Sequence, residues 1–191
     1  MSKLETNTID TISGSTDLQL GSTNATIIKA NNKILFNNSG DGIYLGVTSA
    51  TASNLLDDYE EGTWDFAVTT TGGSVTMDSN NNACWYTKIG RVVFIGGQVF
   101  VSSVSSPTGA IIVTLPFTGE DLPEGSEFNS GSVVISGSVS KNARDFVLLK
   151  SNPTEMRIFI GDVSSISSGN ANAQQLTTNT QINFQLTYIA V

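Results

Sequence analysis

The sequence predicts an all-β protein: an antiparallel β-sandwich of jelly-roll type, preceded by an N-terminal stem of short strands that several chains share. Two observations predict the sandwich. From Thr63 onward, apolar and polar residues alternate with a period of two and β-branched residues are abundant, as in half-buried antiparallel strands. Turn-forming residues interrupt this pattern at regular spacing, and helical periodicity is nearly absent.

The expected strands of the sandwich are short and follow one another closely. They cover residues 63–70, 74–77, 83–88, 92–101, 110–115, 132–138, 145–150, 155–160 and 181–189. Turns are expected at Gly72-Gly73, Ile89-Gly90-Arg91, Pro107-Thr108-Gly109, Asn129-Ser130-Gly131 and Asn152-Pro153. Eight or nine antiparallel strands with such turns favour a sandwich or jelly roll over residues 63–191.

Residues 1–47 have a different pattern. Short groups of two or three apolar residues recur every seven to nine residues, separated by Gly, Asn, Ser and Asp. Strands this short bury too little apolar surface to be stable alone. Either the segment stacks as an irregular solenoid, or copies from several chains share one axis; a flexible tail is the third alternative. We favour the shared axis, and therefore a stem made by several copies of the chain.

Residues 48–62 form the expected hinge between stem and sandwich. Ala50, Ala52, Leu55, Leu56 and Tyr59 are spaced for one or two helical turns. Residues 57–65 also carry five acidic and no basic side chains. We interpret this cluster as a solvated charge run, with a cation site or a catalytic carboxylate pair as alternatives.

Composition excludes several classes of function. The chain has no histidine and one cysteine, Cys84, which removes imidazole-based catalysis, intramolecular disulfides and the usual zinc sites. An enzyme would have to use carboxylates, Lys or Tyr, and we expect no enzyme, no cofactor and no metal. With a net charge of -8 and nine scattered basic residues, nucleic acid is not an expected partner. We expect no membrane insertion and no signal peptide, because no apolar run is long enough for a membrane span and none follows Lys3.

Ser, Thr and Asn together make up about a third of the residues, which predicts a polar, uncharged surface. Asn80, Asn81 and Asn82 are expected at a loop tip, where they could hydrogen-bond a host glycan. Trp85 and Tyr86 are neighbours in an expected strand, so they face opposite sides and at most one is buried. The outward side chain belongs to a subunit interface or a ligand surface, and Trp85 joins the asparagines as a candidate contact.

Three motifs resemble those of bacteriophage tail-fibre and virion appendage proteins. The first is DDYEEGTW at residues 57–64, the second YTKIGRVV at 86–93 and the third LPFT at 115–118. The stretch 182–189 is also similar to the terminal strand of that family. Where the family usually continues with Thr-Pro after the tryptophan, this chain has Asp65-Phe66.

The residues of these motifs suit structural roles. Gly62 frees the backbone at the sheet entry, Trp64 brings a large apolar ring whose indole N–H needs a partner, and Gly90 permits a tight turn or bulge after Tyr86. We assign all four residues to the structure rather than to ligand contact.

The resemblance implies a trimeric virion structural protein that displays its β domain for receptor binding and host attachment. Residues 1–47 would then bind other virion proteins of the tail or capsid. The alternative is a capsid decoration (cement) or head-fibre protein seated on the phage head, and a glycan depolymerase is a third, weaker interpretation. The expected location is the virion, assembled in the cytoplasm of an infected bacterium.

Overall fold

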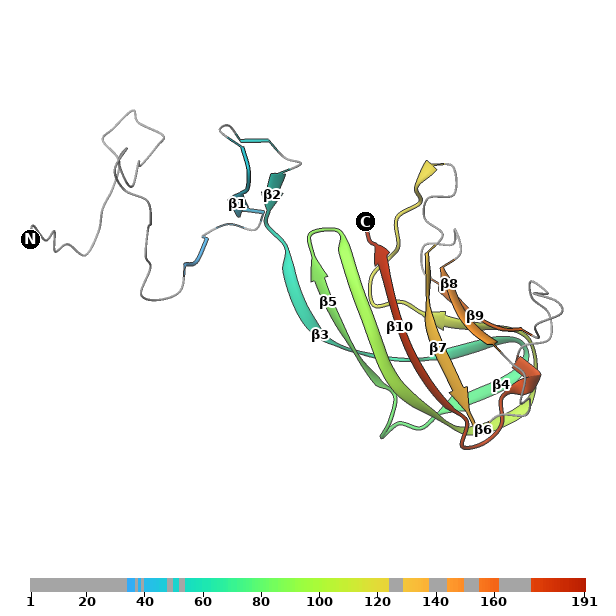
Figure 1. Ribbon diagram of the computed structural model, residues 1–191. Coiled ribbons are helices and arrows are strands. Elements are labelled where there is room, and N and C mark those ends of the chain that lie inside the picture. Colours follow the sequence, from blue (N-terminus) through green and yellow to red (C-terminus); the bar gives the residue numbers. More distant parts are fainter. Residues whose placement is uncertain are drawn as a thin grey trace, which may run out of the picture. The chain divides into compact units, whose positions relative to one another are not determined.

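The structure is a computed structural model that describes residues 34–36, 38, 40–47, 50–51, 54–123, 129–137, 144–149, 155–161 and 173–191 (Figure 1). The chain divides into two compact units, residues 1–38 and 39–191, and all described strands belong to the second. These strands are β1 (Ile43–Tyr44), β2 (Leu55–Leu56), β3 (Tyr59–Asp65), β4 (Val68–Met77), β5 (Ala83–Ile89), β6 (Val92–Thr114), β7 (Ser130–Ser136), β8 (Arg144–Leu149), β9 (Glu155–Gly161) and β10 (Gln181–Ile189). A 3₁₀-helix, η3 (Ala173–Gln175), precedes β10.

Every described strand pairing is antiparallel, and this confirms the predicted all-β, sandwich-like fold class. The main sheet contains a closed path: β6 pairs with β10, β10 with β7, β7 with β8, β8 with β9, and β9 with β6 again. A ring of five strands cannot be antiparallel throughout unless one strand reverses its direction. The reversing strand is β6, whose first half pairs with β10 and whose end pairs with β9.

β6 is 23 residues long and turns back on itself (Figure 1). The bend lies in the serine-rich stretch before Ile111, where Ser106 and Gly109 have φ values of 41° and 83°. The sequence predicted two strands here, separated by a turn at residues 107–109. That prediction was wrong about the break, because the partner strand β4 continues its pairing with β6 past the bend.

β4 follows β3 almost directly in sequence. β3 pairs with β5, and β4 pairs with the second half of β6. Gly72 and Gly73, predicted as a turn, lie inside β4 at two register shifts. Gly73 has a φ of 68°, which is easily adopted by glycine, so the pair makes a bulge in a continuing strand.

The predicted helical turn in residues 48–62 is corrected only in its second half, because a 3₁₀-type hydrogen bond from the Asn54 N–H to the Thr51 carbonyl precedes β2. Leu55 and Leu56 form β2, which pairs with β1, and Tyr59 begins β3 rather than closing a helix. β3 pairs with β5 over seven residues. These long-range pairings outweigh the weak helical preference that the local spacing of apolar residues indicates. The sheet therefore starts at 59 rather than 63, and its compact unit starts at 39.

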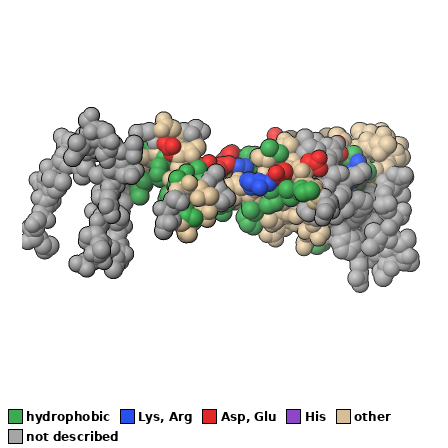
Figure 2. All heavy atoms as spheres, turned by 90° about the horizontal axis from the view of Figure 1, so that it is seen from above, with side chains coloured by type: hydrophobic (Ala, Val, Ile, Leu, Met, Phe, Trp, Pro, Cys, Tyr) green, Lys and Arg blue, Asp and Glu red, His purple; other side chains and the backbone are tan. Residues whose placement is uncertain are grey.

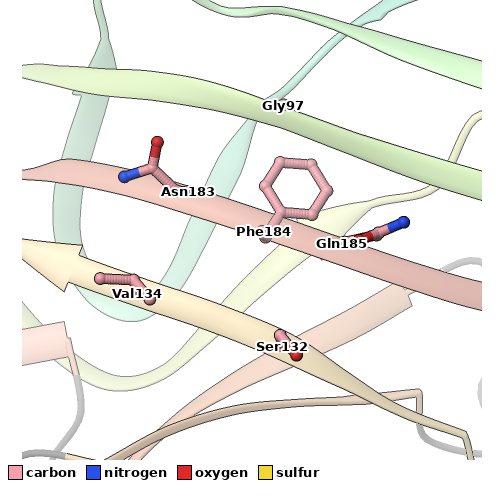
Figure 3. Close-up of a pocket in the computed structure, with 6 residues that line it drawn as sticks. All are labelled: Gly97, Ser132, Val134, Asn183, Phe184 and Gln185. Atoms are coloured by element: carbon pink, nitrogen blue, oxygen red, sulfur yellow. The ribbon is translucent and has the colours of Figure 1, made fainter.

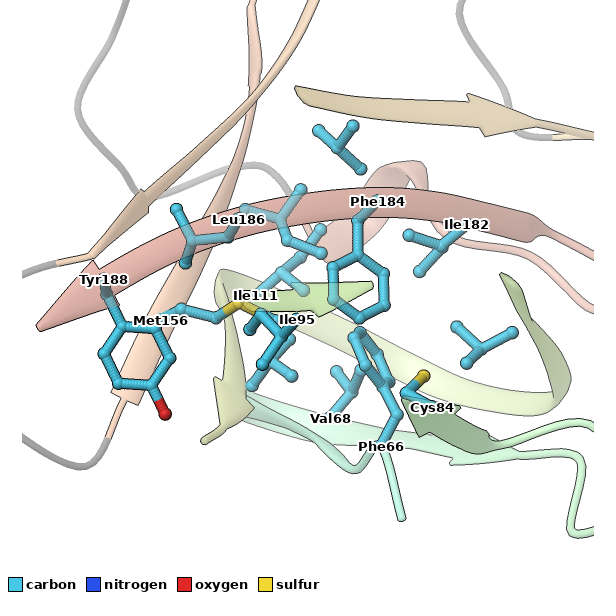
Figure 4. Packing of buried hydrophobic residues seen from close by; sticks show 14 of the residues in the cluster. Phe66, Val68, Cys84, Ile95, Ile111, Met156, Ile182, Phe184, Leu186 and Tyr188 are labelled. Atoms are coloured by element: carbon cyan, nitrogen blue, oxygen red, sulfur yellow. The ribbon is translucent and has the colours of Figure 1, made fainter. Parts of the chain in front are cut away.

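The core lies on the concave side of the bent sheet (Figure 4). Inward residues of β6 and β10 form its centre, and Phe66 and Phe184 meet there with ring centroids 5.0 Å apart. Cys84 is buried in the same cluster. Most of the predicted stem, residues 1–47, lies outside the described residues, and its trimerisation stays a prediction, as does the jelly-roll assignment.

Candidate functional site

The three sequence motifs meet at one end of the sheet. In β5, Tyr86 points inward and lies across Gly62 of β3, and its hydroxyl donates a hydrogen bond to Glu60 Oε1 at 2.5 Å. The Tyr86 ring also contacts Phe117 edge to face, with centroids 5.0 Å apart. Lys88, two residues further, is buried, forms an ion pair with Asp58 and lies 5.7 Å from the Phe117 ring centroid.

Tyr188 of β10 completes this cluster. Its buried hydroxyl donates to the Phe117 carbonyl at 3.0 Å and accepts from the Phe117 N–H at 3.2 Å. Burial raises the pKa of Tyr188 well above its usual range. The three motifs thus stabilise one another through residues 58–62, 86–88 and 117. Their packing explains why the three motifs occur together in this chain.

Gly90 and Arg91 form the two-residue loop between β5 and β6, since Ile89 pairs with Val92. Only Gly90 has a positive φ, 56°, as in a type II′ turn, so the structure places a tight turn where one was expected. Arg91 forms an ion pair with Glu120, and at this end of the sheet basic and acidic side chains lie side by side (Figure 2). Trp64 packs edge to face on Phe184, and its buried Nε1 has no hydrogen-bond partner among the described residues.

The acidic side chains of residues 57–65 do not gather at one place in the structure. Glu60 and Glu61 are adjacent in β3 and therefore project to opposite sides of the sheet, Glu60 to Tyr86 and Glu61 to the hydroxyl of Tyr59. These two bonds raise the pKa of Tyr86 and of Tyr59. Within the described part of the chain, no three acidic or cysteine side chains are grouped so that they could hold a metal ion.

The loop of Asn80, Asn81 and Asn82 connects β4 and β5. The Asp78 carboxylate organises it, because Oδ1 accepts the Asn80 N–H at 3.0 Å and Oδ2 accepts from Asn81 Nδ2 at 2.8 Å. Both bonds lower the pKa of Asp78. The Asn82 carbonyl accepts from the Phe66 N–H. The side chain of Asn81 is thus used in closing the turn, while Asn80 is exposed at its tip.

Trp85 projects outward from β5, on the face opposite to Tyr86, as strand alternation predicted. Its ring is 44% exposed and covers Gly96 of β6, where an added Cβ would lie 2.6 Å from Trp85 Cζ2. The indole therefore lies low over the strand instead of standing away from it. Gly96 is buried beneath this ring.

The strand registers place Trp85 in a row across the sheet. Thr63 pairs with Trp85, Trp85 with Gly96, Gly96 with Gln185, and Gln185 with Ser132. We call these five residues the Trp85 row. In the neighbouring row, Gln98 Nε2 donates to Asn183 Oδ1 at 2.9 Å. The outward positions of β5, β7, β10 and the first half of β6 carry no charged side chain.

Two shallow hollows lie along the Trp85 row. The first, about 420 Å³, is bounded by the outward side chains of Glu61, Thr63, Trp85 and Thr87 together with the backbone between them. The second, about 240 Å³, is lined by Gly97, Ser132, Val134, Asn183, Phe184 and Gln185 (Figure 3). Each hollow includes a square of four outward side chains, so both open on the outer face of the sheet.

Of the predicted contact residues, the structure brings only Trp85 into this surface. Gln185, Asn183 and Gly96 were not predicted from the sequence. Alternation in 181–189 could have identified the outward amides, but their position beside Trp85 depends on the pairing of β10 with β6, which no local pattern encodes.

Among the described residues, no helix is both long enough and apolar enough to span a membrane.

No family model and no curated protein matches the chain. A solved structure, that of the Dettilon tailspike protein, is similar in fold, with a TM-score of 0.54 at 15% sequence identity. The match covers 68% of this chain and 23% of the tailspike chain, so this chain spans less than a quarter of that relative. The antiparallel β unit described above is therefore similar in fold to one part of a phage tailspike.

Proposed function

We propose that this protein is a structural component of a bacteriophage virion, a homotrimeric tail appendage that displays its β unit for attachment to the host surface. Residues 1–47 would join it to other virion proteins. The observation that carries the proposal is the likeness of the β unit to part of a tailspike protein. The resemblance of residues 57–64, 86–93 and 115–118 to appendage motifs supports it, and the structure brings these motifs into contact.

The outer face of the sheet supports a role in attachment. It combines an exposed indole with amide and hydroxyl groups and lacks charge over four strands. Exposed apolar groups within a polar surround are typical of interaction surfaces. The net charge of -8 also disfavours nucleic acid as the partner.

We further propose that the protein binds without cleaving its target. A glycosidase needs two carboxyl groups facing one bond, roughly 5–10 Å apart. Glu60 and Glu61 lie on opposite sides of β3, and Asp58 forms an ion pair with Lys88. The neighbours Glu60 and Glu61 therefore do not form such a pair, and we propose that Asp58, which is engaged by Lys88, does not act together with Glu60. Incubating the full chain with host polysaccharide at several pH values should release no reducing ends.

The deciding experiment locates the protein on phage particles. Antibodies against the full chain, coupled to gold and viewed by electron microscopy, should label the tail tip or tail side. Purified protein should also slow phage adsorption to host cells. Labelling of the head instead would support the alternative, a capsid decoration or head-fibre protein, and absence from particles would refute both.

The trimer has its own test. Light scattering coupled to size exclusion should give three times the chain mass of 20.1 kDa. A stable monomer at micromolar concentration would contradict the trimeric assembly while leaving virion location to the microscopy.

A further inference from the structure

We propose that the Trp85 row is the floor of a binding trough for a neutral oligosaccharide, laid across the strands of the outer sheet face. This inference rests on the proposed attachment function and identifies the ligand class and the contact residues. The row crosses β3, β5, β6, β10 and β7, which are neighbours in the sheet. With about 4.8 Å between strands, its length is about 19 Å, enough for several sugar rings.

The shape of the row depends on its small residues. Gly96 has no side chain, and Thr63 and Ser132 are short, so the row is lower than its neighbours, which carry Phe94 on one side and Gln98 on the other. The two hollows lie at either end of the row, one around Thr63 and one around Ser132. Between them Trp85 covers Gly96 and forms the middle of the floor.

The chemistry of the floor suits a sugar. One face of a pyranose ring presents C–H groups, and such a face packs on an indole, while the hydroxyl groups at its edges need donors and acceptors. The indole of Trp85 is 44% exposed. Gln185 and Asn183 provide amides beside the second hollow, and Thr63 and Glu61 provide oxygens beside the first.

The charges favour a neutral sugar over an acidic one. The one charged side chain that lines either hollow is the carboxylate of Glu61, which accepts hydrogen bonds from hydroxyl groups but repels carboxylates. No basic residue lines either hollow, so a uronic acid or sialic acid would lack a counter-charge. The net charge of -8 acts in the same direction.

The arrangement of Trp85 on Gly96 also has a purely structural explanation, in which the ring protects the backbone at a glycine within a sheet. That explanation does not account for the uncharged amides that continue the same row on β10 and β7. The two explanations differ in what Gln185→Ala does: it should leave stability unchanged in both, but it should weaken sugar binding only if the trough is a site.

The test begins with the full-length chain on a printed array of glycans. The array carries neutral glycans of hexoses and N-acetylhexosamines and acidic glycans of uronic and sialic acids. Saturable binding is expected to neutral members and not to acidic ones. The strongest neutral glycan, as a free oligosaccharide, is then titrated by calorimetry against the protein and its variants.

Three variants of the site and two controls separate the contributions. Trp85→Leu should weaken binding at least about tenfold, since aromatic anchors dominate such contacts, and Trp85→Phe should restore most of the loss. Gln185→Ala should weaken it by about fivefold. The controls are Tyr44→Leu, which removes an aromatic side chain of almost equal exposure, 43%, and Gln174→Ala, an exposed glutamine of η3. Both controls should bind like the parent chain.

Several outcomes would overturn the trough. The first is no saturable binding to any neutral glycan, and the second is stronger binding to acidic glycans. The third is an unchanged affinity in Trp85→Leu and Gln185→Ala when urea unfolding shows that both variants are folded. A lower oligomer mass in Trp85→Leu would instead identify the face as a subunit contact and would also overturn it.

The proposed function can fail separately. If the protein labels the tail and blocks adsorption but Trp85→Leu blocks equally well, the attachment function stands and the trough does not. If the protein binds neutral glycans through Trp85 but is absent from particles, the trough stands and the virion role does not.

Discussion

The ring of Tyr86 occupies the space that a side chain on Gly62 would need: a Cβ built on Gly62 lies 2.7 Å from the Tyr86 hydroxyl oxygen and 2.9 Å from its Cζ. The two residues are partners in the β3–β5 ladder. The same hydroxyl donates to Glu60. The glycine of one motif is therefore required by the tyrosine of another, although 24 residues separate them.

This relationship predicts that Gly62→Ala destabilises the protein by about 1–3 kcal/mol, because the ring must leave its position and lose its contact with Phe117. Urea unfolding followed by circular dichroism measures the change. The double variant Gly62→Ala/Tyr86→Ala should be more stable than the sum of its single variants predicts. Strict additivity would show that the ring does not constrain residue 62.

The ion pair of Asp58 and Lys88 predicts an unequal response to removal of its two partners. The Lys88 side chain is 11% exposed and that of Asp58 is 45% exposed. Asp58→Asn removes the ion-pair partner of a buried ammonium and should cost about 1–3 kcal/mol, whereas Lys88→Met should cost less. The more exposed pair is the control, and Arg91→Met should change the unfolding free energy by less than about 1 kcal/mol.

The turn at Asp78 predicts a pH dependence. Its pKa is lowered in the folded chain by the hydrogen bonds from Asn80 and Asn81, so the carboxylate stabilises the fold at pH values above its unfolded pKa. This contribution decreases as the pH falls through the lower, folded pKa. Comparing the parent with Asp78→Ala between pH 6 and 2 should show a stability difference that shrinks with acidification. A constant difference would contradict this role.

Cys84 should be unreactive while the protein is folded. Burial raises the pKa of its thiol to about 12, so at pH 8 about one molecule in ten thousand carries the thiolate. An unfolded cysteine, with a pKa near 8.5, has a thiolate fraction about a thousandfold higher or more. Labelling with a thiol reagent should therefore be slow in buffer and fast in urea. Fast labelling in buffer would place the thiol outside the core.

The strand pattern was largely predictable because alternation reports which face is buried. β5, β9 and β10 begin where the sequence predicted them. The failures occur where turn-forming residues serve another purpose. Gly72-Gly73 and residues 107–109 were interpreted as chain reversals, but β4 and β6 continue through them as a bulge and a bend. A local pattern does not distinguish a glycine that ends a strand from one that bends it.

The candidate surface was predictable in part for the same reason. Adjacent residues of a strand face opposite sides, so one of Trp85 and Tyr86 had to point outward, and Trp85 was predicted to be that residue. The asparagines were placed correctly at a loop tip, but the bonds of Asn81 to Asp78 depend on the turn geometry. The amides beside Trp85 come from β10 and could be assigned only once the sheet was closed.

The bend of β6 also bears on the order in which the protein folds. Strands β3 to β6 pair with close neighbours in sequence, whereas the first half of β6 also needs β10, which follows after nearly half the chain. Closing so long a loop is entropically costly and slows folding. During synthesis, the edge of the first half of β6 that pairs with β10 therefore stays unpaired until residues 181–189 emerge. In that interval an unclosed chain exposes a strand edge to its neighbours, which makes prompt closure a condition for high yield.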